Sequence, residues 1–240
     1  MWNILPRFIK NMRHTWVLGK INEKSIENEF LYDYRMLSKL NVESYSQFGQ
    51  DFFIYNCIFN GKSDGIFMDV GGNDPIIINN TYLFETKGWT GFAFEPIKTL
   101  CDKWGEERDT PCFNVAIGSE CIDAIRFSQS ESDVLSGIGI KGQIADEYMI
   151  RQETITSFLD SKNITCVDLL FIDVEGYEME VLKGIDFDRI DISCICVENN
   201  RKSEILPDLK MRDYLISKGY RLIARLTIDD VFVKGKLLKK

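Results

Sequence analysis

The 240-residue sequence predicts an α/β protein with a doubly wound, mostly parallel sheet of seven strands that ends in an antiparallel hairpin. Two observations predict this fold class. Short, almost continuously apolar segments alternate with helical segments of about ten to fifteen residues, which is typical of a parallel sheet covered on both faces. The last two apolar segments are joined by only a few residues, and a parallel crossover does not fit into so short a connection. These two strands are therefore expected to pair as a hairpin.

The expected elements follow one another without an internal repeat. Strands are predicted at residues 66–72, 90–96, 112–118, 167–176, 191–200, 221–226 and 229–235. Helices are predicted at residues 44–59, 79–88, 97–108, 154–164, 177–185 and 206–220, and the first of them is expected to begin with an N-cap. An N-terminal helical extension, residues 1–45, is expected to precede a single domain at residues 46–240.

Local signals refine two of these regions. Asn80 or Thr81 is the expected N-cap of the second helix, which ends at Gly88. Residues 119–150 are less regular and predict a β-ribbon and a mobile loop. Within them, the glycine-containing stretch 136–139 is a candidate loop for closing over a substrate.

The composition excludes several classes of function. A net charge of −8 and a pI near 4.9 argue against nucleic acid as a partner, because nucleic-acid binding rewards a basic surface. The seven cysteines show no metal-ligand spacing, and their positions in apolar runs indicate core packing in a reducing, cytoplasmic compartment. His14 is the one histidine and lies in a segment that looks peripheral, which disfavours a histidine base or a multi-histidine metal site.

The first 20 residues carry four basic and no acidic side chains, but no apolar run in the chain is long enough to span a membrane. Apolar residues recur there at helical spacing, namely Ile4, Leu5, Phe8, Met12 and Trp16. The favoured interpretation is a helix packed on the domain or on a partner subunit. Peripheral contact with an anionic membrane surface is the alternative, and the oligomeric state stays open.

Acidic residues gather where the predicted strands end. In a doubly wound sheet, ligands bind beyond the carboxyl ends of the strands. The residues at these ends are Asp69, Gly71, Gly72, Asn73 and Asp74 after the first strand, Glu95 and Pro96 after the second, Asp173 and Glu175 after the fourth, and Glu198 and Asn199 after the fifth. Structural ion pairs do not readily explain so many acids, so the sequence predicts a shared ligand site.

The chemistry of the first two strand ends narrows the ligand. Glu95 lies roughly 25 residues after the glycine turn, where an acid accepts both hydroxyl groups of a ribose. The turn lacks the third glycine of a dinucleotide fingerprint, and Asp69 and Asp74 would repel a pyrophosphate. These acids suit a cationic ligand better. S-adenosylmethionine carries a ribose, an ammonium and a sulfonium group, and it is the predicted cofactor.

Seven motifs together resemble the FkbM family of class I methyltransferases, which use S-adenosylmethionine. They are SQFGQD (46–51), FMDVGGNDP (67–75), NNT (79–81), GWTGFAFEP (88–96), LLFIDVEGYEMEVLKG (169–184), CVEN (196–199) and DDVFV (229–233). The resemblance runs from about Ser46 to Val233 and departs at Gly72, where the family usually has alanine. It implies a Rossmann-like fold and methyl transfer to a hydroxyl group of a sugar, a glycan or a natural product.

Within this resemblance, the site residues take expected roles. The candidates for removing the acceptor proton are Asp173, Glu175 and Glu198, since no histidine is at hand. The expected cofactor contacts are Gln50, Asp69, Gly71, Gly72, Asn73, Glu95 and Pro96. Gln50 belongs to SQFGQD, which is expected at the methionine end of the cofactor, although a helix cap with solvated glutamines explains that motif too. Direct contact of NNT with the cofactor is the weaker alternative to a helix cap.

A magnesium ion is a further possibility at these strand ends. Related small-molecule O-methyltransferases bind Mg²⁺ with acids at the ends of strands four and five, and the metal lowers the pKa of the acceptor hydroxyl group. Asp173, Glu198 and Asn199 occupy such positions. The alternative is that Asp173 or Glu175 acts without a metal while Glu198 holds a loop or the substrate.

Two other functions stay open at this point. A nicotinamide-dependent oxidoreductase could use a similar sheet, although the defective glycine pattern counts against it. A non-catalytic, methyltransferase-like binding module is the third possibility, and the run of acids at the strand ends counts against that one. For an O-methyltransferase, the acceptor is expected to be a carbohydrate or a lipid-linked glycan.

Overall fold

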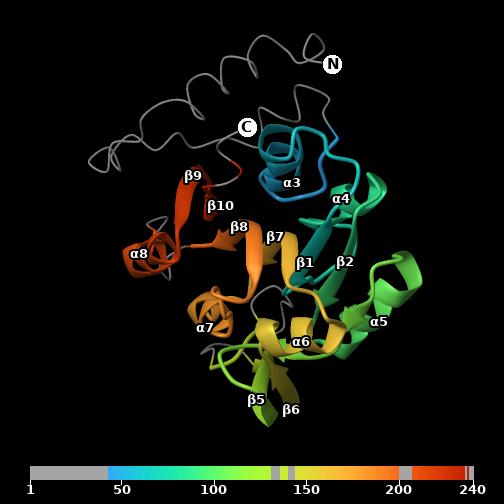
Figure 1. Cartoon of the computed structure of the whole chain (residues 1–240). Helices are drawn as coiled ribbons and strands as arrows, with labels where there is room; N and C mark the ends of the chain where they lie inside the picture. Colours follow the sequence, from blue (N-terminus) through green and yellow to red (C-terminus); the bar gives the residue numbers. More distant parts are fainter. Residues whose placement is uncertain (1–42, 131–135, 140–143, 200–206, 236, 238–240) are drawn as a thin grey trace.

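The computed structural model describes residues 43–130, 136–139, 144–199, 207–235 and 237 (Figure 1). The expected N-terminal helix therefore lies almost entirely outside the described residues, and so do the parts of the expected mobile loop at 131–135 and 140–143. Within the described part of the chain, no helix is both long and apolar enough to cross a membrane.

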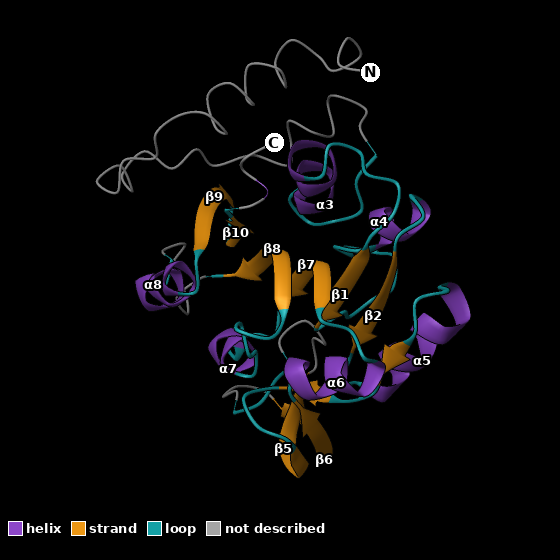
Figure 2. Cartoon of the chain, in the orientation of Figure 1, coloured by secondary structure: helices purple, strands orange, loops and turns teal. Residues whose placement is uncertain are grey.

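A seven-stranded sheet forms the centre of the molecule and confirms the predicted fold class (Figure 2). Its strands are β1 (Ile66–Val70), β2 (Thr90–Phe94), β3 (Cys112–Phe113), β7 (Cys166–Ile172), β8 (Asp191–Glu198), β9 (Tyr220–Leu226) and β10 (Asp229–Lys234). The order across the sheet is β3-β2-β1-β7-β8-β10-β9. The first five strands in this order are parallel, and β10 pairs antiparallel with both β8 and β9. The closing hairpin is thus confirmed.

Alternation along each strand divides the core between the two faces of the sheet. Leu170 and Ile172 of β7 belong to one apolar cluster, whereas Leu169 and Phe171 belong to the other. Successive side chains of a strand point to opposite faces, and both faces here are buried. Cys194 and Cys196 share the second face, as the sequence predicts.

Helices cover both faces of the sheet. The first cluster includes buried residues of α6 (Ile155–Lys162), α7 (Glu178–Lys183) and α8 (Leu209–Ser217). The second includes residues of α3 (Gln50–Phe53), the π-helix η2 (Ile54–Ile58) and α4 (Tyr82–Thr86). In Figure 1, α3 accordingly lies on the opposite side of the sheet from α6 and α7. The remaining helix, α5 (Lys98–Glu107), joins β2 to β3.

A small second sheet interrupts the expected third strand at 112–118. The chain leaves the main sheet after β3 because Asn114 Nδ2 donates hydrogen bonds to the carbonyl groups of Glu95 and Pro96, just beyond the end of β2. The next strand, β4 (Ala116–Ile117), pairs with β6 instead. The prediction of one continuous strand here is therefore wrong.

The expected β-ribbon at 119–150 is confirmed. Its strands are β5 (Ile122–Ser130) and β6 (Ile144–Glu153), which pair antiparallel and complete a sheet of order β4-β6-β5. Figure 2 shows the ribbon projecting beyond α6, away from α3. The stretch 136–139 is tied to it, because Ser128 and Gly137 exchange two backbone hydrogen bonds.

The helix predicted at 44–59 starts later than expected and has a different N-terminus. It begins at Gln50, after Gly49 in a left-handed conformation with φ of 77°, and no side chain caps it. Ser44 and Ser46 are held away from a helix because both hydroxyl groups donate to the buried carboxylate of Asp51.

The N-cap position of α4 is Thr81, one of the two predicted residues, but the capping oxygen comes from elsewhere. Neither Asn80 nor Thr81 supplies the capping oxygen. Asn79 Oδ1 accepts hydrogen bonds from the backbone N–H groups of Thr81 (2.9 Å) and Tyr82 (2.8 Å). Asn79 therefore supplies the capping oxygen, while Thr81 donates its hydroxyl group to Asp69 of β1.

Candidate active site

A cavity of about 580 Å³ opens at the carboxyl ends of β1, β2, β7 and β8. Of the residues expected at the site, it is lined by Asp69, Gly71, Gly72, Asn73, Asp74, Glu95, Pro96, Asp173, Glu175 and Glu198. Ser136, Gly137 and Ile138 form part of another wall, so the stretch singled out in the ribbon borders the cavity. The structure thus brings residues far apart in the sequence to one edge of the sheet.

The turn after β1 is built for close packing of the backbone. Gly71 has φ of 84°, and a Cβ atom there would lie 1.8 Å from the carbonyl oxygen of Asp173. A Cβ atom on Gly72 would lie 2.7 Å from the ring of Trp104. Trp104 in turn donates a hydrogen bond from Nε1 to the carbonyl oxygen of Asn73 (2.8 Å). Both glycines are therefore required by their neighbours, and the turn is fixed from two sides.

Asp69 and Asp74 border the same cavity but have different partners. Asp69 is buried and accepts a hydrogen bond from Thr81 Oγ1 (2.6 Å). Burial raises the pKa of Asp69. Asp74 accepts hydrogen bonds from the N–H groups of Ile76 and Ile77 and pairs with Lys103, and these contacts outweigh burial and lower its pKa. Asp74 therefore already has a structural task in the turn.

Glu95 follows β2 and is held by the backbone. Its Oε2 accepts the N–H of Asn73 (2.8 Å), and its Oε1 accepts the N–H of Ile97 (2.7 Å). The carboxylate thus bridges the ends of β1 and β2 at the wall of the cavity. Pro96, the next residue, is positioned from the second sheet, since its carbonyl oxygen accepts hydrogen bonds from Asn114 and Tyr148.

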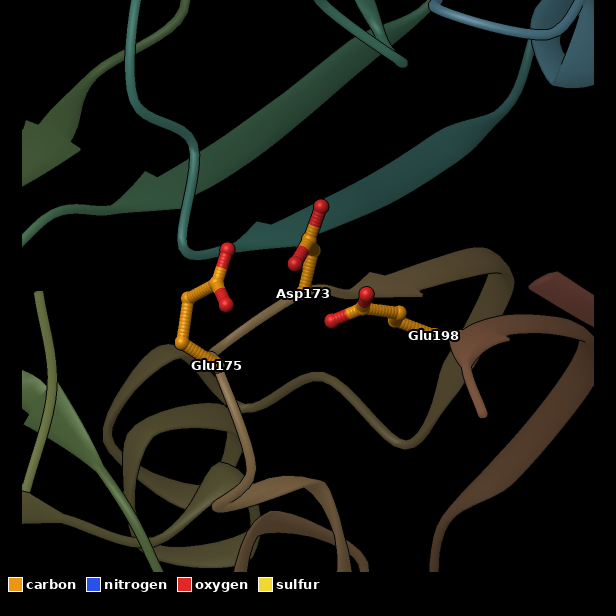
Figure 3. A group of neighbouring side chains, drawn as sticks. All are labelled: Asp173, Glu175 and Glu198. Atoms are coloured by element: carbon orange, nitrogen blue, oxygen red, sulfur yellow. The ribbon is translucent and has the colours of Figure 1, made fainter. Parts of the chain in front are cut away.

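The three proposed catalytic acids come together as a group (Figure 3). Asp173, Glu175 and Glu198 each offer a carboxylate oxygen, and these oxygens lie within 4.8 Å of one another. Asp173 is fixed by the hydrogen bond from its own N–H to the carbonyl oxygen of Val70 (2.9 Å). Glu175 lies in the loop after β7, with φ of 56°, and is followed by Gly176 with φ of 100°. This left-handed pair turns the chain so that Glu175 faces the other two acids.

The proximity of these acids changes their protonation. Burial first, and then repulsion from Glu198, raise the pKa of Asp173 well above its ordinary value. Burial and the charge of Asp173 raise the pKa of Glu175 to about 7. Burial and the charge of Glu175 raise the pKa of Glu198 to about 7, although a hydrogen bond from Asp173 opposes this rise. The pKa values of all three carboxyl groups are therefore raised, and those of the two glutamates lie near neutral pH.

A fourth acid beside this group, Asp229, was missed among the candidate site residues. It opens β10 opposite Glu198, and Gln50 Nε2 donates a hydrogen bond to its Oδ2 (2.7 Å). Burial and the charge of Asp173 raise the pKa of Asp229 to about 8. Gln50 itself is buried against Asp229, and the neighbouring Gln47 lines the cavity in its place. The motif DDVFV contains the signal that could have indicated Asp229.

Asn199 is not brought into the acid group. Its Oδ1 accepts the N–H of Asp208 (2.6 Å), and its Nδ2 donates to Asp230 Oδ2 (2.6 Å). Arg212 and Arg225 pair with the same buried Asp230. The side chain expected to bind a metal thus belongs to an ionic network that holds α8 and β9 against the end of β8, and Glu175 takes its place among the acids.

Arg108 is a second residue that was missed, and it organises the loops around the cavity. Its Nη1 donates to the carbonyl oxygen of Pro75 (3.2 Å) and to Asn79 Oδ1 (3.0 Å), while Glu85 accepts from its Nε (2.9 Å). The guanidinium group lies 4.2 Å from the ring centroid of Trp104. In the sequence, Arg108 ends a charged helix and looks solvated, so no local signal predicts its burial.

The charges at the cavity are one-sided. Six carboxyl side chains line it, and none of the described lining residues is Lys, Arg or His. The cavity therefore favours a cation, or a neutral group that donates hydrogen bonds, over an anion. The Oδ1 atom of Asn80, another lining residue, is buried and has no hydrogen-bond partner among the described residues. That oxygen can accept a hydrogen bond from a ligand.

One known protein family matches the part of the chain that forms the site. A search of curated proteins gave no match. The Methyltransferase FkbM domain matches residues 69–222, which is more than half of the chain and runs from Asp69 in β1 into β9. The matched region contains the acid group and most of the cavity wall. The chain therefore belongs to the FkbM methyltransferase family.

Proposed function

We propose that the protein transfers a methyl group from S-adenosylmethionine to a hydroxyl oxygen of a sugar, a glycan or a related small molecule. The observation that carries this proposal is the one-sided charge of the cavity, with six carboxyl groups and no cationic side chain among its described lining residues. A dinucleotide would bring a pyrophosphate against these acids. This counts against a nicotinamide-dependent oxidoreductase, the main alternative.

The residues present fit the cofactor. Glu95 is placed for the ribose hydroxyl groups, since a carboxylate accepts several hydrogen bonds and this one is already oriented by two backbone donors. Gly71, Gly72 and Asn73 line the cavity wall beside Asp69, whose carboxylate suits an ammonium or sulfonium group. When bound, S-adenosylmethionine supplies the electrophilic methyl group.

The acid group is suited to removing the proton of the acceptor hydroxyl group. A hydroxyl oxygen that gains a methyl group must lose its proton, and a base works best when its pKa lies near the working pH. Glu175 and Glu198, with pKa values of about 7, meet this condition. A hydrogen bond between the side chains of Asp173 and Glu198 holds Glu198 in place. Orientation of the acceptor oxygen supplies the remaining contribution.

The charge of the cavity also limits the acceptor. A phosphate or carboxylate group on the acceptor would meet the same acids without a described cationic partner in the wall. We therefore expect an uncharged acceptor, such as a neutral sugar, rather than a nucleotide sugar.

Binding experiments test the cofactor. Titration calorimetry with S-adenosylhomocysteine is expected to show binding, whereas NAD⁺ is expected to show none. Glu95→Gln should weaken the binding of S-adenosylhomocysteine by about tenfold or more, since one hydrogen bond to a charged group is worth about 1.5–3 kcal/mol. Glu107→Gln, on the outer surface of α5, is the matched control and should leave it unchanged. Binding of NAD⁺ alone would contradict the proposal.

Incubation with an acceptor panel tests the transfer. Neutral glycans and nucleotide sugars would be incubated with the protein and S-adenosylmethionine, and mass spectrometry would look for the gain of one methyl group. We expect the gain on a neutral acceptor and its loss in Asp173→Ala. A protein that binds the cofactor product but methylates no hydroxyl compound would point to a binding module.

A second possibility is that the acid group binds a magnesium ion. The geometry favours Glu175 as a ligand in place of the expected Asn199. Asp173, Glu175 and Glu198 together offer three close carboxylate oxygens, which are ligands that Mg²⁺ accepts. If the ion is required, EDTA should abolish activity, Mg²⁺ should restore it, and Asn199→Ala should not change the Mg²⁺ dependence. Full activity in EDTA would show that the carboxyl groups act without a metal.

A further inference from the structure

A second depression adjoins the cavity and extends it across the surface. It has a volume of about 490 Å³ and is lined by Ser44, Tyr45, Ser46, Gln47, Ile76, Ile77 and Ile78. Gln47, Ile77 and Ile78 also line the main cavity. The two depressions are therefore continuous, and a molecule that enters the cavity can leave part of itself in the second one.

The shared border is apolar and exposed. Ile77 is 66% exposed and Ile78 is 62% exposed, which makes them the most exposed large hydrophobic residues in the described part of the chain. Ile78 has φ of 55°, in the left-handed region. This conformation is unfavourable for a β-branched residue, and such strained residues cluster at ligand sites.

The two isoleucines are held in place on both sides. Asp74 Oδ1 accepts the backbone N–H groups of Ile76 (2.9 Å) and Ile77 (2.7 Å). On the other side, Asn79 Nδ2 donates to the carbonyl oxygens of Asp74 (3.0 Å) and Gly72 (3.2 Å). The turn is thus fixed by hydrogen bonds, and it presents the isoleucine side chains to solvent at the mouth of the cavity.

Both serine hydroxyl groups of the second depression are engaged elsewhere. The hydroxyl groups of Ser44 and Ser46 donate to Asp51 Oδ1, at 2.6 and 2.7 Å. What the depression offers a ligand is therefore mainly the apolar surface of Ile76, Ile77 and Ile78. Surface of this kind binds the hydrocarbon part of a molecule.

We infer that the acceptor is an uncharged amphiphile whose hydroxyl-bearing end enters the acidic cavity while its hydrocarbon part lies on Ile77 and Ile78. This inference rests on the proposed function and adds a binding subsite to it. The acids and the absence of a cation among the described lining residues select the neutral head, and the continuous apolar border selects the hydrocarbon part.

Calorimetry with a matched pair of glucosides tests the subsite. The full chain, saturated with S-adenosylhomocysteine, would be titrated with methyl β-D-glucoside and with octyl β-D-glucoside below its micelle concentration. Octyl glucoside is expected to bind at least about tenfold more tightly, since burial of two or more methylene groups gives that ratio. Octyl β-D-glucuronide, which has the same tail and a carboxylate on its sugar, should bind several-fold more weakly than octyl glucoside.

Substitution of the isoleucines locates the effect. Ile77→Asn/Ile78→Asn should reduce the affinity ratio of the two glucosides to about twofold or less, and asparagine tolerates the left-handed conformation of residue 78. Ile216→Asn is the matched control, because Ile216 is 54% exposed on α8 and lines neither depression. It should keep the full ratio. Thermal unfolding would confirm that both variants are folded.

Several outcomes would overturn the inference. Equal affinity of the wild-type chain for the two glucosides would do so, as would a ratio that survives in the double variant. If trypsin instead cleaves the double variant more readily within residues 1–42, that segment is what covers the isoleucines. If the substitutions convert a dimer into a monomer, a second copy of the chain covers them. Failure of the wild-type chain to bind S-adenosylhomocysteine would overturn the proposed function itself.

Discussion

At the scale of single residues, Glu175 and Glu198 have the same raised pKa but different surroundings. Glu198 accepts a hydrogen bond from Asp173, whereas Glu175 stands on a left-handed loop and is raised mainly by burial and by the charge of Asp173. Of the two glutamates, Glu175 is therefore the better candidate for removing the proton of the acceptor hydroxyl group. Glu198 is better suited to hold the acceptor or to share its proton with Asp173.

We predict that Glu175→Gln lowers the methylation rate about 10²- to 10⁴-fold, the usual contribution of a general base. In the wild type, the rate should rise with pH through about 7, because the ionised carboxylate is the active form. In Glu175→Gln this step should disappear from the pH profile. Initial rates between pH 5.5 and 8.5 measure both effects, with Glu180→Gln, on α7, as the control. A rate within threefold of the wild type would assign the proton to another group.

The candidate residues that the sequence identifies share one property, which is that they end a strand. Asp69, Glu95, Asp173 and Glu198 were found because the carboxyl ends of parallel strands meet at one edge, whatever the details of packing. Asn199 stands one residue further, and the turn of the chain takes its amide to Asp208. The residue that ends a strand can thus be predicted from the sequence. The direction in which the side chain of the following residue points cannot.

At the scale of elements, the turn after β1 and the helix α5 form one unit. Gly72 touches Trp104, Trp104 donates to Asn73, and Arg108 stacks on Trp104. The sequence predicts the turn and the helix separately, but their contact depends on residues about 30 positions apart. This is why Arg108 could not be identified before the fold was known.

Gly72→Ala should lower the free energy of unfolding by about 1–3 kcal/mol, since the new methyl group must push the ring of Trp104 aside. Trp104→Phe leaves space in that position, so the two substitutions together should cost less than the sum of their separate effects. Urea unfolding of the four proteins in this cycle gives the coupling energy. Additive costs would show that the alanine is accommodated without displacement of Trp104.

Arg108→Met should lower the free energy of unfolding by about 3–5 kcal/mol, because it leaves Glu85 and several acceptors buried without their partner. Arg189→Met is the matched control. Arg189 pairs with Asp160 at an exposed position, and loss of such a pair costs about 1 kcal/mol or less. Equal losses in the two variants would show that Arg108 does not hold the loops.

At the scale of the whole molecule, the main sheet brings several carboxyl groups to one edge. Without a cation between them, these groups cannot all be ionised at once. The sequence predicts the α/β layers, the parallel direction of most strands and the final hairpin because apolar periodicity and connection lengths are local properties. The split of the third strand follows from the side chain of Asn114 and from pairing with β6, which is distant in sequence. Acid repulsion across the sheet edge is likewise a property of the assembled fold, and it has a measurable consequence for stability.

We predict that the protein becomes less stable as the pH rises from about 4.5 to 8. An unfolded glutamate ionises near pH 4.5, whereas Glu175 and Glu198 keep their protons to about pH 7 and Asp229 to about pH 8 in the folded state. Between these values the folded state binds more protons than the unfolded state, so the free energy of unfolding falls with rising pH. Above pH 8 the loss from these groups is complete.

Glu175→Gln/Glu198→Gln should flatten this dependence. At pH 8 the variant should unfold with a free energy about 1–2 kcal/mol higher than the wild type after allowance for solvent screening, while at pH 5 the two should agree. Glu180→Gln is a control of opposite sign, because Lys183 lowers the pKa of Glu180 and its ionised form stabilises the fold. The same double substitution is expected to abolish activity, so stability and catalysis would change in opposite directions, which a general loss of structure cannot produce.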